Sequence, residues 1–269
     1  MNQSETSKLS NLYWILSGFV IGNAMVAELL GMKIFSLGKL FNISPIQVSA
    51  PFSLTIDFNM SVGILIWPLV FIISDLINEY FGRKGVRKIS FFTAGIILFG
   101  FIFIFIGTAL PGADFWLELN NQDPSGKPFD VNFAYQTIFM QSGGIIIGSL
   151  TAFLFSQLID AYAFQYLKKI TGHKKLWLRA TGSTIISQLF DSFIILFIAF
   201  YILGNWTFSQ VLAVGVVQYL YKIILAIVLT PLIYLAHNYI DRYLDDEHPT
   251  EQLVYNPKDL SEINIASKN

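Results

Sequence analysis

Long apolar blocks alternate with short polar segments along most of the chain. Each block holds about 20 residues or more, which is the helical length that crosses a hydrocarbon core of ~30 Å. Because backbone groups in lipid must be satisfied internally, such blocks predict transmembrane helices. We expect about six helices, over residues 12–32, 59–81, 89–110, 135–166, 177–203 and 209–237. The pattern predicts an all-α polytopic bundle at 12–240, preceded by an N-terminal tail at 1–11 and followed by a polar C-terminal tail at 241–269.

Composition agrees with this fold class. Hydrophobic residues make up 54% of the chain and charged residues 13%, whereas an average soluble domain carries about 25% charged residues. The absence of cysteine excludes disulfides, thiolate catalysis and Cys-ligated metals. The polar N-terminus lacks the basic region of a removable signal peptide, so none is expected. Basic residues fall in short clusters between apolar blocks, which does not favour nucleic-acid binding.

Two basic loops predict the orientation of the helices. They read GRKGVRK at 82–88 and KKITGHKKLWLR at 168–179, and two predicted helices separate them. Because Lys and Arg in short loops resist translocation, both loops are expected in the cytoplasm. The acidic segment 111–134 and the uncharged turn GNWTFS are then outside, and both termini are inside. The Pro-containing segment 33–58 is amphiphilic and fits a surface or re-entrant segment as well as an open loop.

Polar residues recur inside the predicted helices, where an ionisable group costs from ~2.5 kcal/mol upward and needs a protein interior or a wet cavity. At 1.5 Å per residue, Asp191 and Lys222 lie about 18 and 20 Å inside their helices. Two carboxylates, Asp75 and Glu79, are spaced i,i+4 on one helical face. The full set is Asn23, Glu28, Asp75, Asn78, Glu79, Gln157, Asp160, Gln188, Asp191, Gln218 and Lys222.

Structural roles explain some of these residues. Asp191 and Lys222 could form an ion pair between helices, Glu79 and Asp160 could cap or extend to a helix end, and Asn or Gln often bonds neighbouring helices. These roles explain less well why acids, amides and one base recur on several helices at overlapping depth. A wet or ligand-lined cavity explains the whole set better.

A short repeat accompanies these residues. SQLIDAYAF at 156–164 and SQLFDSFII at 187–195 share Ser-Gln-Leu-x-Asp, and SDLINEYF at 74–81 is a looser relative. A five-residue match is weak evidence for duplication, because neighbouring helices with similar needs can converge. Similar polar sets on several helices nevertheless favour a site at a repeat interface.

Four motifs in order carry a family resemblance: SDLINEYFGRKGVRK, SQLIDAYAFQYLKK, LWLRATGSTIISQLFDSFIILFIAF and QYLYKIILAIVLTPLIY. In this combination the chain resembles the queuosine precursor transporter family, also called the vitamin uptake transporter family, over about residues 12–240. The resemblance implies a six-helix protein of the bacterial inner membrane that imports 7-deazaguanine precursors of the tRNA base queuosine. The matching positions are Asp75, Asn78, Glu79, Gly82, Gln157, Asp160, Arg179, Ser187, Gln188, Asp191, Gln218 and Lys222. The 111–134 loop and the tail beyond Asp241 depart from the family pattern.

We therefore predict a substrate site. Its expected members are Asp75, Asn78, Glu79, Gln157, Asp160, Gln188, Asp191, Gln218 and Lys222, with structural or gating roles for Asn23, Glu28, Arg179 and Ser187. A carboxylate can accept both donors on the ring edge of a 7-deazaguanine, while Gln or Lys donates to its carbonyl. Phe155, Phe190, Tyr162 or Tyr219 are candidates to stack on the ring.

Energy coupling and other functions stay open at this point. The chain has no G-x-x-x-x-G-K-[ST] motif, so transport is passive or ion-coupled unless a partner hydrolyses ATP. The spacing of Asp75 and Glu79 motivates a proton-coupling hypothesis, and a substrate-binding component of a partner-energised system is the alternative. We expect no catalytic residue, metal or cofactor, because H-E-x-x-H is absent and His173, His237 and His248 lie outside the buried polar set. GGIIIGSL at 143–150 offers a small-residue face for packing within one chain or in a homo-oligomer.

Overall fold

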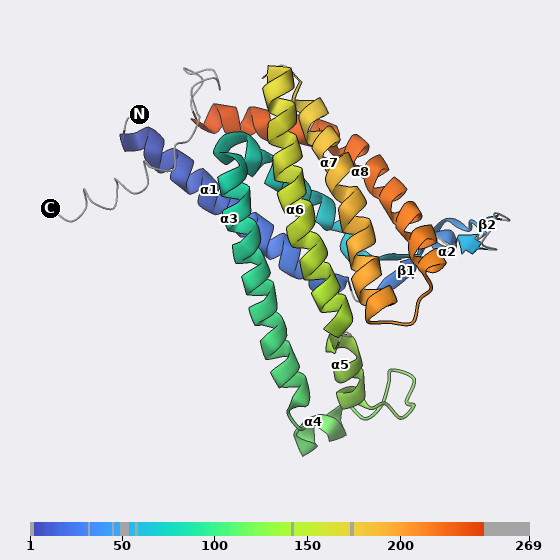
Figure 1. The fold of residues 1–269 in the computed structure, drawn as a ribbon. Coiled ribbons are helices and arrows are strands. Elements are labelled where there is room, and N and C mark those ends of the chain that lie inside the picture. The colour runs from blue at the N-terminus through green and yellow to red at the C-terminus, as the bar shows by residue number, and fades with distance from the viewer. Residues whose placement is uncertain are drawn as a thin grey trace.

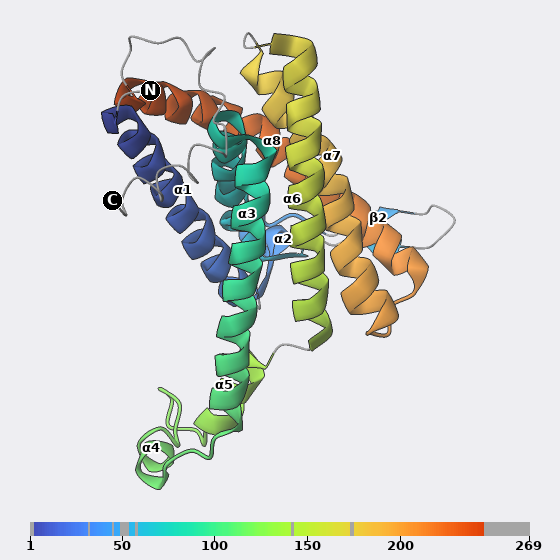
Figure 2. The same ribbon diagram turned by 60° about the vertical axis from the view of Figure 1, so that its left-hand side comes forward.

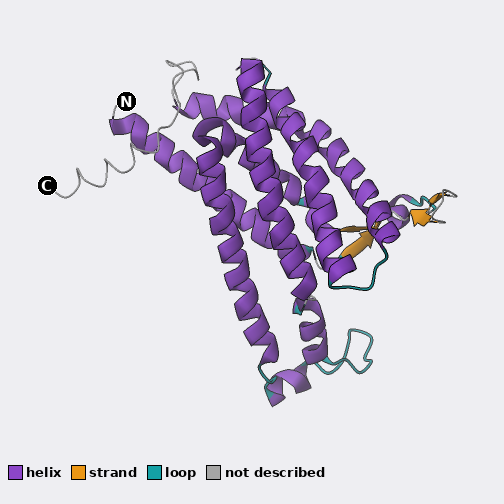
Figure 3. Cartoon of the chain, in the orientation of Figure 1, coloured by secondary structure: helices purple, strands orange, loops and turns teal. Residues whose placement is uncertain are grey.

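The computed structural model describes residues 3–31, 33–44, 46–48, 54–56, 59–140, 143–172 and 175–244. Helices account for most of them (Figure 3). His173, His248 and the part of the predicted C-terminal tail from residue 245 onward lie outside the described residues. The first helix begins at Gln3, so residues 3–11, which were expected in an N-terminal tail, are helical.

Five helices in the described part of the chain are long and apolar enough to cross a membrane. They correspond to α1 (Gln3–Leu30), α3 (Trp67–Ala109), α6 (Gly143–Thr171), α7 (Leu176–Leu196) and α8 (Phe208–Leu244). The apolar segment of α6 also takes in the shorter helix α5 (Val131–Phe139), and that of α7 continues into the π-helical segment η3 (Phe197–Ile202). An all-α polytopic membrane fold is confirmed.

The two helices predicted at 59–81 and 89–110 together form α3, which is broken at Gly82. Its 43 residues would extend about 64 Å if straight, roughly twice the hydrocarbon core. Gly82 instead has φ 64° and ψ −173°, a left-handed conformation that glycine adopts without the usual steric cost. The chain turns back there, so α3 has two arms, 67–81 and 83–109 (Figures 1 and 2).

The first arm begins later than predicted, at Trp67. Pro68 lies in its first turn, where the missing N–H of proline costs nothing. The preceding residues form the strand β4 (Asn59–Ser61) and the short 3-10 helix η1 (Val62–Leu65) instead of a continuation of the α-helix. β4 pairs antiparallel with β1 (Ile34–Ser36), and β2 (Ile46–Val48) pairs with β3 (Leu54–Ile56), with the short helix α2 (Leu37–Phe41) following β1. The described part of segment 33–58 is therefore structured.

The turn at Gly82 lies at the same end of the molecule as the last turn of α6 and the first turn of α7 (Figures 1 and 2). The N-terminal half of α1 and the C-terminal end of α8 lie there too. Tyr13 of α1 donates to the carbonyl of Gly85 at 3.1 Å, and Tyr80 donates to Asp241 of α8 at 2.6 Å. We call this the basic end. α8 contains Pro231, which interrupts helix geometry, and its last part runs across the basic end. The assignment of this end to the cytoplasm stays a prediction.

Antiparallel packing of α6 against α7 forms the centre of the fold, with α8 beside α7 and α3 beside α6 (Figure 1). Small residues allow the close approach. A side chain at Gly148 would place its Cβ 3.1 Å from the Cβ of Ala199 and 3.2 Å from the carbonyl of Ile195. The described part of the small-residue motif at 143–150 therefore packs within the chain.

The opposite end carries α4 (Asp114–Leu119), the turns around Asp123 and α5 (Figure 2). The second arm of α3, which leads there, exposes Phe91, Phe99 and Phe103 on one face while Ile97 and Phe101 are buried. This exposed apolar face of a membrane-length helix fits contact with lipid.

Candidate functional site

A cavity of about 590 Å³ lies between the transmembrane helices, within the size range of small-molecule sites. Helices α1, α3, α6, α7 and α8 supply most of its wall. Ile34 and Ser61, from the paired strands, and Trp206, from the loop before α8, line it as well. We call it the central cavity.

The central cavity brings together five of the nine residues predicted to bind substrate. These are Asp75, Gln188, Asp191, Gln218 and Lys222. Glu28, predicted to have a structural or gating role, also lines it. The other predicted residues, which do not line it, are Asn78, Glu79, Gln157, Asp160, Asn23, Arg179 and Ser187.

The charged members of the cavity differ in their partners. Lys222 donates from its ammonium group to Asp191 Oδ2, and Ser156 Oγ donates to Asp191 Oδ1 at 3.2 Å. An ion pair near the middle of a membrane removes the cost of two isolated charges. Glu28 and Asp75 have no ion pair with any described residue.

Several polar atoms of the cavity residues are buried without a hydrogen-bond partner among the described residues. They are Glu28 Oε1, Asp75 Oδ1, and both Oε1 and Nε2 of Gln188. Unpaired buried polar groups are rare in proteins because each costs about 1–3 kcal/mol. Their residues line the cavity, so a rotation of each side chain would bring these atoms to a polar molecule or water bound there. They include both donors and acceptors.

The two Ser-Gln-Leu-x-Asp motifs contact each other reciprocally. Ser156 of the α6 motif donates to Asp191 of the α7 motif, and Ser187 of the α7 motif donates to Asp160 at 3.0 Å. Antiparallel helices with equally spaced Ser and Asp produce this exchange with local two-fold symmetry. The symmetry ends at the glutamines, because Gln157 accepts from Ser74 of α3 at 2.6 Å, whereas Gln188 lines the cavity.

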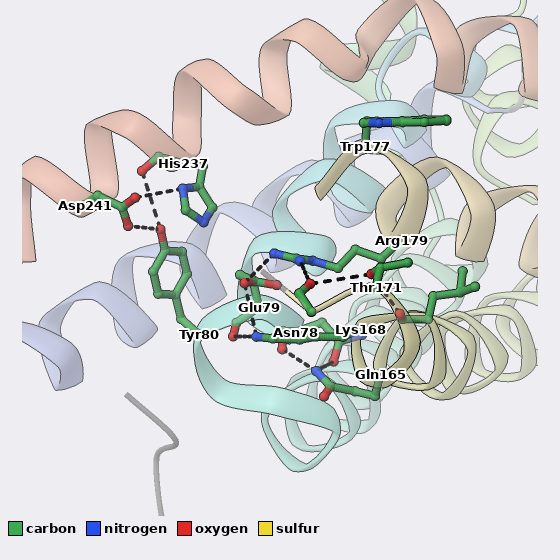
Figure 4. A network of polar contacts seen from close by, with 12 residues as sticks. Asn78, Glu79, Tyr80, Gln165, Lys168, Thr171, Trp177, Arg179, His237 and Asp241 are labelled. Atoms are coloured by element: carbon green, nitrogen blue, oxygen red, sulfur yellow. Dashed lines mark hydrogen bonds and ion pairs between the residues drawn. The ribbon is translucent and has the colours of Figure 1, made fainter. Parts of the chain in front are cut away.

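Closer to the basic end, polar residues do not line the cavity but form hydrogen bonds and ion pairs with one another (Figure 4). Glu79 Oε1 accepts from Arg179 Nη2 at 2.7 Å and lies 3.1 Å from Lys168 Nζ. The side chains of Glu79 and Arg179 are 1% and 2% exposed. Arg179 also donates to the carbonyl of Gly172 at 2.7 Å. This ion-pair cluster of Glu79, Lys168 and Arg179 ties α3, α6 and α7 together.

Neighbouring contacts extend the connection to α8. Tyr80 donates to Asp241, whose other oxygen lies 2.8 Å from His237 Nδ1. Asn78 donates to the carbonyl of Ala161 at 3.3 Å and accepts from Gln165 at 2.9 Å. Side chains from α3, α6, α7 and α8 meet in this way at the basic end (Figure 4).

Aromatic side chains line the central cavity, but they are not the ones that the sequence suggested. Phe155, Phe190 and Tyr162 are exposed on the outer surface, and Tyr219 donates to the carbonyl of Ile185. The cavity is lined instead by Trp67, Phe71, Phe153, Phe200 and Trp206. Trp67 packs against Phe153 with ring centroids 5.5 Å apart, and Phe200 packs against Trp206 at 4.5 Å.

Helical spacing could have identified three of these aromatic residues. Trp67 and Phe71 precede Asp75 by eight and four positions, which places all three on one helical face. Phe153 precedes Gln157 by four positions in the same way. Trp206 lies in a loop and Phe200 in the π-helical segment, so no regular spacing predicts them. Of the remaining predicted residues, Asn23 donates to the carbonyl of Phe19 in its own helix at 2.7 Å.

Comparison with known proteins gives consistent matches. The sequence model of one family, described as "Putative vitamin uptake transporter", matches residues 61–236. A protein of Bacillus subtilis (strain 168) named "Probable queuosine precursor transporter" is 30% identical over 200 residues, which are 74% of this chain and 79% of the relative. A protein of the same name from Haemophilus influenzae is 28% identical over 177 residues, 64% of this chain and 66% of the relative. No solved structure matches the chain.

Proposed function

The chain belongs to the vitamin uptake transporter family, and we propose that it imports a 7-deazaguanine precursor of queuosine through the central cavity. As a member of this family with five membrane-length helices among its described residues, it is a multi-pass bacterial membrane transporter. The proposed substrate class comes from the names of the two relatives and from the fit of the cavity to such a ring.

The observation that carries the proposal is the set of unpaired donors and acceptors beside aromatic side chains. A 7-deazaguanine presents an N1–H and an exocyclic amine on one edge, next to a carbonyl. The carboxylate of Asp75 can accept from the two donors, and Gln188 Nε2 can donate to the carbonyl. Stacking of a base on an aromatic ring is worth roughly 1–3 kcal/mol, and Trp67 and Trp206 are the proposed stacking partners. Gln218 and the Asp191–Lys222 pair complete the proposed polar wall.

For Glu79 and Arg179 we propose a gate. The cavity lining reaches Asp75, one helical turn before Glu79, and the ion-pair cluster lies beyond it toward the basic end. In alternating access, a path must open on one side of the site while it is closed on the other. The buried pair of Glu79 and Arg179 joins α3 to α7 across the proposed path, so it must separate for substrate to leave there.

We also propose that transport is coupled to protons, because two carboxyl groups lie next to each other beside the cavity. Asp75 and Asp160 are adjacent buried carboxyl groups with no ion pair to a described residue, and such a pair must hold at least one proton or a counter-charge. A substrate-binding component energised by a partner is the second candidate. The lack of a nucleotide-binding motif in this chain fits both.

The test of transport is uptake of labelled precursors by a bacterium that can neither make nor import them, read out as uptake and as queuosine in tRNA. We expect the wild-type chain to restore both. Failure of a well-expressed, folded protein to import any precursor would contradict the substrate class. Purified protein in liposomes then separates the two candidates, because only a self-sufficient transporter takes up substrate without a partner. Uptake that ignores an imposed pH gradient, with Asp75→Asn fully active, would rule out proton coupling.

The gate predicts a specific pattern of defects. Arg179→Gln leaves Glu79 with only the partly exposed Lys168 as a cation and should lower stability by about 3–5 kcal/mol. The double variant Glu79→Gln/Arg179→Gln removes both buried charges, so it should regain most of this stability, measured as thermal denaturation in detergent. With the gate weakened, the double variant should exchange substrate across the membrane without concentrating it. Normal concentrative uptake by the double variant would contradict a gating role.

A further inference from the structure

The central cavity is lined by more carboxyl groups than basic groups. Its ionisable lining residues are Glu28, Asp75, Asp191 and Lys222. Lys222 is paired with Asp191, which leaves two carboxyl groups without a cation among the described residues. An isolated carboxylate in a low-dielectric interior is strongly unfavourable, so each must be balanced by a proton or by a positively charged ligand.

The two unpaired carboxyl groups differ in their surroundings. Asp75 lies beside the carboxyl group of Asp160, and two adjacent carboxyl groups can share a proton between them. Glu28 is near Asp191, which Lys222 already pairs, and near the hydroxyl group of Ser149. It lies in the last turns of α1, away from the basic end, is 6% exposed and lines the cavity, and its Oε1 has no hydrogen-bond partner among the described residues.

From this difference we infer that Glu28 is the specificity-determining residue of the cavity and selects substrates that carry a protonated amine. This inference rests on the proposed function. The ring is held by Asp75 and Gln188, and a positively charged substituent binds Glu28. A charge-assisted hydrogen bond is about twice as strong as a neutral one, and a wrong substituent leaves the carboxylate unpaired. Glu28 lies outside the residues 61–236 that the family model matches.

Two compounds with the same ring test the inference because the substituent at position 7 is charged in one and neutral in the other. 7-Aminomethyl-7-deazaguanine carries a protonated amine, and 7-cyano-7-deazaguanine carries a neutral nitrile. Uptake of each labelled compound is measured in liposomes or cells with wild-type protein and with Glu28→Gln, which keeps the size of the side chain and removes its charge. Glu118→Gln is the matched control, since Glu118 is exposed in α4 outside the cavity.

We expect wild-type protein and Glu118→Gln to favour the amine over the nitrile by about tenfold or more in kcat/KM, the size of one charge-assisted contact. Glu28→Gln should lose this preference, because amine uptake falls with the lost contact and nitrile uptake rises once no carboxylate is left unpaired. An equal preference in wild type and Glu28→Gln would overturn the inference but leave the proposed function standing. Uptake of neither compound by wild-type protein would overturn both.

The wild-type protein also provides a test that needs no variant, which matters if Glu28→Gln does not fold. Unlabelled amine should compete with labelled nitrile at about tenfold lower concentration than unlabelled nitrile does. Equal competition by the two compounds would overturn the inference. Partial recovery of the preference in Glu28→Asp, which restores the charge on a shorter side chain, would support it further.

Discussion

The two Ser-Gln-Leu-x-Asp motifs have the same sequence pattern but different environments. In the α6 motif, Gln157 is bonded to Ser74 and Asp160 lies against Asp75, both from α3. In the α7 motif, Gln188 has no partner among the described residues and Asp191 meets Lys222 of α8 at the cavity wall. The motif on α6 thus joins helices, and the motif on α7 faces a cavity.

This difference shows that the neighbouring helix, and not the motif itself, determines whether the motif bonds another helix or lines the cavity. α3 packs against the motif on α6. α8 lies beside the motif on α7, and residues of both α7 and α8 line the cavity. If the motifs share an origin, one copy has kept the hydrogen-bonding role and the other is available to a ligand. Matched substitutions in the two copies test this division.

The largest expected contrast is between the two aspartates. Asp191→Asn leaves the ammonium group of Lys222 without its carboxylate, and an unpaired buried charge costs about 3–5 kcal/mol, so uptake should fall by at least ~100-fold. Asp160→Asn removes one of two adjacent carboxyl groups and breaks no ion pair with a described residue, so uptake without a pH gradient should stay within about threefold of wild type, while its response to an imposed pH gradient should be lost. Uptake of a labelled precursor at matched expression measures both.

A double variant separates a binding role from a structural one. Asp191→Asn/Lys222→Met removes both charges, so the protein should recover expression and thermal stability. If the pair contacts substrate, uptake stays lost in this folded protein. Recovery of uptake together with stability would reduce the pair to a structural ion pair and contradict its role in the site.

A smaller contrast is expected between the two glutamines. Gln188→Ala breaks no hydrogen bond seen in the structure, so stability should hold while uptake falls about tenfold from the lost ligand contact. Gln157→Ala breaks the bond from Ser74 inside the protein and should lower stability by about 1–3 kcal/mol, with uptake largely retained. Thermal denaturation in detergent and initial uptake rates, measured on the same preparations, check the pair. Equal uptake defects in the two variants would mean that Gln157 also contacts substrate.

Much of the fold could be predicted from the sequence because lipid permits few alternatives. Apolar blocks of membrane length identified all the long helices, and polar residues inside them marked the cavity and the ion-pair cluster. The helix end at residue 81 was predicted, but residues 83–88 were expected in a basic loop and instead form the start of the second arm of α3, because one left-handed glycine turns the chain. The late start of α3 at Trp67 depends on strand pairing with residues 34–36, a contact distant in sequence.

The division of the polar residues into paired and unpaired sets could not be predicted. Glu79 and Asp75 are four positions apart on one helix, yet only Glu79 meets an arginine, and that arginine comes from a different helix. Aromatic residues were harder still, because helices in lipid carry apolar side chains on both inner and outer faces. Phe153 and Phe155 are two positions apart, and only the first faces inward.

The smallest contrast is between the two serines, each of which donates to the aspartate of the other motif. Both Ser156→Ala and Ser187→Ala remove one hydrogen bond to a carboxyl group, so each should lower stability by roughly 1–3 kcal/mol, or a few degrees in Tm. They should differ in uptake, because Ser156 orients the cavity carboxylate of Asp191 whereas Ser187 bonds Asp160, which does not line the cavity. We expect about a two- to fivefold loss of uptake for Ser156→Ala and wild-type uptake for Ser187→Ala, the effect of misplacing one ligand group without removing it. An equal loss of uptake in the two variants would mean that both motifs contribute to the substrate site, and would contradict the different roles proposed for them.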